Sequence, residues 1–106
     1  MRFEVRFAPE AEDDLLRLLD FQLERATCAE DLLYAQRVID SVQFALDTQL
    51  ALNPFGFRKA GDGRRSTRRE LIIPAGATGF VALYEITGPA SVMVLAVRHQ
   101  REDDYH

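Results

Sequence analysis

The chain of 106 residues contains a single cysteine, Cys28. One cysteine excludes an internal disulfide and any metal site built from several thiolates, and it is typical of a protein from a reducing compartment. The sequence around Cys28 offers no neighbouring base or metal ligand, so we assign no chemistry to this thiol. We expect neither a metal nor another cofactor.

Long apolar runs are also missing. The longest are far shorter than the ~20 residues that a membrane-spanning helix needs. The opening residues 1–7 alternate apolar with charged side chains, so they lack the continuous apolar core of a signal peptide. We therefore expect a soluble, cytoplasmic protein without membrane contact.

The composition is that of one folded domain covering residues 1–106. Hydrophobic residues make up 47% of the chain, enough to offset the entropy of ordering a single core. The net charge of −4 is unevenly distributed. Residues 1–57 carry eleven acidic and five basic side chains, hence −6, whereas residues 58–106 carry six and eight, hence +2. The two halves are therefore suited to different partners.

Local patterns predict six elements. Alternating apolar and charged side chains indicate a strand over residues 2–7. Apolar residues at helical spacing then predict helices over residues 9–25 and 30–51. Pro9 suits the first turn of a helix, and Asn53-Pro54 ends the second because proline lacks an amide hydrogen. A Gly- and Arg-rich loop, residues 53–67, precedes three strands at residues 69–73, 80–87 and 91–98.

This order predicts an α+β fold. The short link between the helices favours an antiparallel hairpin, and the short links between the later strands favour antiparallel pairing. We expect the helical hairpin to pack on one face of a mainly antiparallel sheet and leave the other face open for binding. Residues 92–97 are apolar at every position, which is typical of a strand that is covered on both faces or central in the sheet.

Four segments in this order resemble the ParE/RelE toxin superfamily, in particular its ParE-like branch of plasmid stabilisation proteins. They are FAPEAEDDL at residues 7–15, NPFG at 53–56, REL at 69–71 and VRHQRE at 97–102. The resemblance covers nearly the whole chain. It implies a toxin of a type II toxin-antitoxin system, with a groove for an arm of a cognate antitoxin that is ParD-like or similar.

The resemblance leaves the target open. ParE-like members resemble inhibitors of DNA gyrase, whereas RelE-like members are ribosome-dependent endonucleases that cut mRNA. A non-toxic remnant that still binds the antitoxin is a third possibility. Because one fold serves all of these, the choice depends on the site.

A RelE-type endonuclease needs cations for the scissile phosphate and groups that move protons. Side chains of the required types are Arg65, Arg69, Arg98, His99, Arg101 and Tyr105. The catalytic roles would fall to Arg98, His99 and Tyr105, because a histidine exchanges a proton near physiological pH.

Other features favour a gyrase inhibitor, which is not an enzyme. A histidine that closes an apolar strand commonly satisfies a local hydrogen bond instead of acting in catalysis. Residues 80–87 and 92–97 contain no basic side chain, and the acids at residues 102–104 would repel RNA. On this interpretation Arg98, His99, Arg101 and Tyr105 bind the target.

A second set of residues is predicted to dock the antitoxin. It consists of a basic cluster with Asp62 as its one opposing charge, together with an aromatic residue: Arg58, Lys59, Arg64, Arg65, Arg68, Arg69 and Tyr84. Arginine suits bidentate contacts with the carboxylates of an acidic antitoxin arm. The alternatives are a solvated loop and direct contact with DNA. Phe55 and Phe57 are either core residues or further anchors for a partner.

Overall fold

The computed structural model describes residues 2–59, 67–75 and 78–100. The helices and strands follow one another as β1 (Glu4–Phe7), α1 (Pro9–Glu24), α2 (Ala29–Leu52), the 3-10 turn η1 (Pro54–Gly56), β2 (Arg58–Lys59), β3 (Arg68–Ala75), β4 (Thr78–Gly88) and β5 (Ser91–His99). The predicted order of a strand, two helices and three strands is confirmed. The one additional strand is β2.

The five strands form a single sheet in the order β1-β5-β4-β3-β2. β1 is parallel to β5, and the other three pairings are antiparallel. The mainly antiparallel sheet is therefore confirmed, and the apolar strand β5 lies inside the sheet, between β1 and β4. The prediction of a loop over the whole of residues 53–67 was wrong at β2. Two residues are too short to show a periodic pattern, and they become a strand only by pairing with Glu70 and Arg69.

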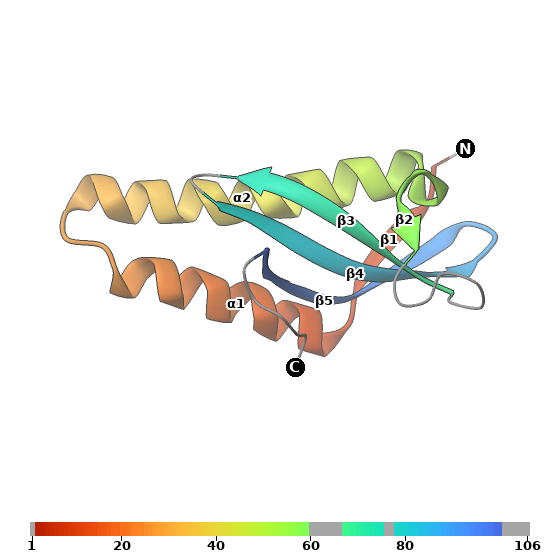
Figure 1. The fold of residues 1–106 in the computed structure, drawn as a ribbon, viewed down its shortest axis with the longest axis horizontal. Coiled ribbons are helices and arrows are strands. Elements are labelled where there is room, and N and C mark those ends of the chain that lie inside the picture. The colour runs from red at the N-terminus through yellow and green to blue at the C-terminus, as the bar shows by residue number, and fades with distance from the viewer. Residues whose placement is uncertain (1, 60–66, 76–77, 101–106) are drawn as a thin grey trace.

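The two helices form an antiparallel hairpin on one side of the sheet (Figure 1). α1 begins at Pro9, and Glu10 and Glu12 place negative charge where the helix dipole is positive. α2 ends at Leu52, directly before the Asn53-Pro54 pair that was predicted to stop it. Within the described ranges, no helix combines the length and the apolar content that crossing a membrane requires.

The core lies between the helices and the sheet. α1 contributes Leu18. α2 contributes Val42, Leu46 and Leu50, and the sheet contributes Leu71, Ile73, Phe80, Tyr84, Val92, Val94 and Val97. Because side chains alternate between the faces of a strand, the neighbours of these residues in β3 and β4 point to the face away from the helices. We call this the open face of the sheet, because the two helices pack on the other one; its residues Val81 and Leu83 are nevertheless buried.

A register shift bends the middle of the sheet. Leu83 pairs with Ala96 and Tyr84 pairs with Val94, so Leu95 is an extra residue in β5. The neighbouring strand β1 ends opposite Val94. Beyond this point the buried carboxylate of Asp14, from α1, accepts a hydrogen bond from the backbone N–H of Val97 at 2.9 Å. A helix side chain thus replaces the missing strand partner and fixes the end of β5.

Candidate functional site

The predicted target-binding residues Arg98 and His99 lie at the end of β5 but point to opposite faces of the sheet. Arg98 pairs across β4 with Val81 and has its guanidinium on the open face, 4.0 Å from a carboxylate oxygen of Glu70. His99 stacks on Phe80 with 4.8 Å between ring centroids, and the ring of Phe21 from α1 meets it edge-on at 5.6 Å. Arg101 and Tyr105 lie outside the described residues. The two described members of the predicted catalytic group therefore do not converge on one point.

Glu70 links two basic residues on the open face. Its two carboxylate oxygens face Arg58 Nε at 3.2 Å and Arg98 Nη2 at 4.0 Å. The side chains of Glu70 and Arg98 are only 16% and 13% exposed, so these charges are largely withdrawn from water and depend on each other. Glu70 thus joins β2 and β5 to β3. Sequence reasoning missed this link, because the three residues are brought together only by the order of the strands.

Arg69 and Tyr84 pair across β3 and β4 on the helix side of the sheet, and both hold η1. Arg69 donates hydrogen bonds to the carbonyl oxygens of Phe55 at 3.1 Å and Phe57 at 2.7 Å. The Tyr84 hydroxyl donates to the carbonyl oxygen of Pro54. Burial raises the pKa of Tyr84 to about 12, although the positive charge of Arg69 acts in the opposite direction.

The burial of Tyr84 requires a correction to its predicted role. Its side chain is 0% exposed and its ring meets Phe57 edge-on at 6.4 Å, so it offers no surface to an antitoxin. The reason is strand alternation, which places Tyr84 on the same face as the core residues Phe80 and Ala82. Tyr84 therefore supports the surface from below and is not part of it.

Two apolar side chains are exposed around this turn. Leu52 at the end of α2 is 69% exposed, and Phe55 in η1 is 59% exposed. The Phe55 ring has an edge contact with Phe3, with centroids 5.9 Å apart, and the Arg69 guanidinium lies 5.8 Å from its centroid. Two exposed basic residues, Arg58 and Lys59, follow in the edge strand β2 and point to opposite sides of the sheet, Arg58 with Glu70 and Lys59 with Arg69. We call Leu52, Phe55, Arg58 and Lys59 the turn surface.

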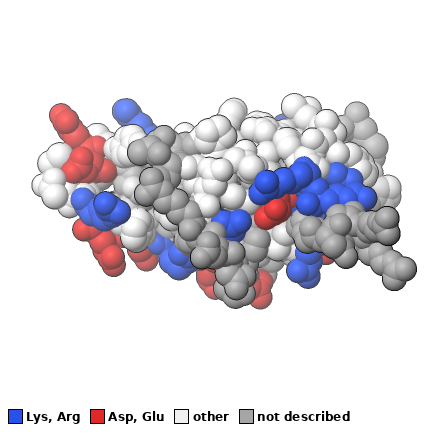
Figure 2. All heavy atoms as spheres, viewed as in Figure 1, with Lys and Arg blue, Asp and Glu red and all other residues white. Residues whose placement is uncertain are grey.

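Basic side chains gather around the turn surface. Figure 2 shows Lys and Arg atoms over the part of the molecule that holds β2 and the start of β3, with acidic atoms among them. Of the predicted antitoxin-binding residues, Arg58, Lys59 and Arg68 are exposed there. Arg64 and Arg65 lie outside the described residues. The basic cluster is therefore only partly placed.

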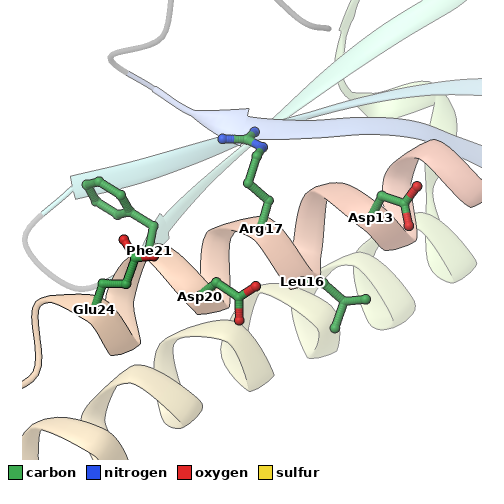
Figure 3. Close-up of a pocket in the computed structure, with 6 residues that line it drawn as sticks. All are labelled: Asp13, Leu16, Arg17, Asp20, Phe21 and Glu24. Carbon is green, nitrogen blue, oxygen red and sulfur yellow. The ribbon is translucent and has the colours of Figure 1, made fainter.

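A separate hollow of about 460 Å³ lies on the outer side of α1 (Figure 3). The lining residues that belong to the described part of the chain come from this one helix: Asp13, Leu16, Arg17, Asp20, Phe21 and Glu24. Arg17 and Phe21 extend toward the strands, whereas the carboxylates lie along the helix (Figure 3). In the described part of the chain, no three His, Cys, Asp or Glu side chains come together in a way that could hold a metal ion. The hollow is thus a feature of the acidic helix layer.

Comparisons with known proteins agree with this geometry. The family model for the ParE toxin of the type II toxin-antitoxin system parDE matches residues 5–104. A chain of a chromosomal ParDE toxin-antitoxin system from P. aeruginosa has a TM-score of 0.71 at 12% identity, covering 92% of this chain and 96% of that chain. A chain of the RelBE2 toxin-antitoxin complex from Mycobacterium tuberculosis has a TM-score of 0.62 at 19% identity, covering 94% and 100%.

The comparison with curated proteins gave no match. Because the two structural neighbours are less than 25% identical to this chain, they establish the fold alone. This fold consists of two helices packed on a mixed five-strand sheet. The family model covers nearly the whole chain, including β1, both helices and the full sheet. The chain belongs to the ParE toxin family of type II toxin-antitoxin systems.

Proposed function

We propose that this ParE-family toxin inhibits DNA gyrase by binding it, and that a cognate antitoxin silences the toxin by occupying its surface. The target would meet the end of β5 and the residues after it, from Arg98 to Tyr105. The observation that carries the choice of a binding protein over a nuclease is the divergence of Arg98 and His99 to opposite sheet faces.

A nuclease requires a different arrangement of these residues. Its cations and its proton-transferring group must approach the same phosphodiester within hydrogen-bonding distance. Here Arg98 lies beside Glu70, and His99 packs between two aromatic rings. A carboxylate on the same face would also repel the RNA backbone. This arrangement favours contact with a protein target over cleavage of RNA.

The antitoxin proposal rests on family membership and on charge. Type II antitoxins are the partners of this family, and both structural neighbours come from toxin-antitoxin systems. Arg58, Lys59 and Arg68 give the β2 end of the sheet an exposed positive surface. Such a surface would attract an acidic antitoxin segment, and the arginine forks suit its carboxylates. Arg64 and Arg65 stay within this proposal as sequence-based expectations.

A supercoiling assay with purified toxin and gyrase tests the target. We expect inhibition or a trapped cleavage complex, weakened by Arg98→Ala and unchanged by Arg37→Ala, which removes an exposed arginine from α2. Circular dichroism of both variants checks that they fold. No effect of the wild-type toxin on gyrase, at concentrations that arrest growth in cells, would remove gyrase as the target.

The alternatives give other outcomes after induction in cells. Codon-positioned cuts in mRNA that disappear with His99→Ala would establish the endonuclease in place of the gyrase inhibitor. Normal growth despite abundant, folded protein and no antitoxin would identify a non-toxic remnant. Primer extension and growth curves measured on the same cultures separate these cases.

A further inference from the structure

The turn η1 is held from beneath by side chains of the sheet. Arg69 donates to two carbonyl oxygens of this segment and Tyr84 donates to a third. Pro54 is itself fully buried, and the N–H of Gly56 donates to the carbonyl oxygen of Asn53 at 3.2 Å. A three-residue turn with this many fixed backbone groups has little conformational freedom left to lose on binding.

This fixed turn carries an exposed aromatic ring. Phe55 is 59% exposed although Phe3 and Arg69 determine where its ring lies, and Leu52, three residues earlier at the end of α2, is exposed as well. Aromatic side chains that are pre-positioned in this way dominate the energetics of protein interfaces. The buried Tyr84 hydroxyl and the Arg69 guanidinium thus hold in place a turn whose aromatic side chain, Phe55, is not part of the core.

The charges beside the Phe55 ring indicate which kind of partner binds there. Arg58 and Lys59 are exposed in β2, and the one acidic group in contact with either of them among the described residues is Glu70, which is largely buried. A partner that covers Leu52 and Phe55 therefore brings its flanking side chains beside positive charge. Carboxylates on those flanks gain attraction, whereas lysines would be repelled.

A nucleic acid would also meet positive charge here, but the ring is poorly placed for it. Stacking of a base needs a free aromatic face. One side of Phe55 is occupied by the Arg69 guanidinium and its neighbour Phe3 makes an edge contact.

We propose that the turn surface binds an acidic amphipathic segment of the antitoxin, with an apolar side chain of that segment seated between Leu52 and Phe55 and its carboxylates reaching Lys59 on one side of the β2 edge and Arg58 on the other. The choice of the antitoxin as the source rests on the proposed function above. The acidic and amphipathic character of the segment is inferred from the turn surface alone.

Two synthetic peptides test this chemistry. One is an amphipathic peptide in which Glu flanks Leu and Phe, and its twin has Lys in place of every Glu. Binding to the full chain is followed by NMR of the backbone amides. The Glu peptide should shift the amides of residues 52–59, and the Lys twin should not. Phe55→Ala should weaken binding about tenfold, because it removes the aromatic anchor.

The matched control is Phe44→Ala, which deletes an equally large exposed ring, 69% exposed, from the outer face of α2. It should leave the affinity for the Glu peptide unchanged. Equal losses from both variants, shifts confined to the helices, or preference for the Lys twin would overturn the proposal. So would single-stranded oligothymidine that binds the turn surface more tightly than the Glu peptide does.

The same variants are then mixed with the product of the reading frame adjacent to the toxin gene, as the candidate antitoxin. Binding to the wild type that Phe55→Ala weakens about tenfold supports both proposals. Equal binding to wild type and Phe55→Ala would refute the turn surface and leave the antitoxin proposal standing. Failure of the antitoxin to bind the wild type would refute the antitoxin as partner, while the peptide result still decides the surface.

Discussion

Asp14 shows how one side chain fixes the end of the interior strand β5. Its carboxylate is 4% exposed and accepts the N–H of Val97 at the point where β1 no longer covers β5. A backbone N–H that is buried without an acceptor costs about 1 to 3 kcal/mol. We therefore expect Asp14→Ala to lower the free energy of unfolding by about that amount, measured by chemical denaturation. Asp14→Asn keeps an acceptor oxygen and should lose less.

The control for Asp14 is its neighbour Asp13, which is exposed on the same helix. Asp13→Ala should change the free energy of unfolding by no more than about 0.5 kcal/mol, as is usual for surface positions. If Asp13→Ala and Asp14→Ala destabilise equally, the helix dipole and not the hydrogen bond to Val97 is the source of the effect.

Tyr84 makes a second prediction at the scale of one residue. Its pKa is raised to about 12 by burial, so the folded state favours the neutral hydroxyl that donates to Pro54. A raised pKa in the folded state means that this stabilisation is complete below the ordinary tyrosine pKa near 10 and is lost as the pH rises through about 12.

Tyr84→Phe measures both consequences. The variant should lose about 0.5 to 1.5 kcal/mol of stability at neutral pH, because the buried Pro54 carbonyl loses its donor. In a tyrosinate absorbance titration, the transition present in the wild type and absent from the variant should lie near pH 12. If the transition that Tyr84→Phe lacks lies instead near the ordinary tyrosine pKa of about 10, the hydroxyl is in water.

At the scale of elements, periodicity located the helices to within about one residue. The predicted helices 9–25 and 30–51 are observed at Pro9–Glu24 and Ala29–Leu52. Strand ends were less accurate, and β3 continues past the expected turn through Pro74 and Ala75. β2 pairs only with residues 69 and 70, so the edge of β3 beyond them has no strand partner in the described structure. Pro74 is tolerated on this edge, because no neighbouring strand there needs its missing N–H group. Such a boundary depends on a distant strand and leaves no local pattern.

The helical hairpin gives the prediction that belongs to this scale. Leu46 is fully buried against the sheet, whereas Phe44, two residues earlier, is exposed on the outer face of α2. Leu46→Ala should lower the free energy of unfolding by about 2 to 5 kcal/mol because it leaves a cavity. Phe44→Ala should stay within about 0.5 kcal/mol of the wild type. The reverse order, measured by denaturation, would mean that α2 presents its other face to the sheet.

The candidate site was only partly predictable for the same reason. The basic residues were visible in the sequence, and Arg58 and Lys59 are indeed exposed. Their neighbours Arg69 and Tyr84 were assigned to the same surface, but strand pairing places them under η1. Which side of a strand a residue takes depends on the position of the helices, and a cluster of charges does not encode this.

At the scale of the whole molecule, the uneven charge of the sequence becomes a charge difference between layers. Residues 2–57, which form β1, the helices and η1, carry −6, whereas the strands β2 to β5 carry five basic and two acidic side chains, hence +3. Figure 2 shows the largest group of basic atoms on this face at the β2 end of the molecule, with smaller groups elsewhere. A partner with an acidic segment should be steered to this end, even though the toxin as a whole is negative.

Association kinetics with the antitoxin test this steering. The rate constant should fall as salt is added, because ions screen charges over about 10 Å at 0.1 M. At low salt, Lys59→Glu at the β2 end should slow association several-fold. Arg37→Glu makes the same change in net charge on the exposed face of α2 and should have little effect. Stopped-flow fluorescence measures both rates, and equal slowing by the two variants would show that net charge, and not its placement, determines how the partner approaches.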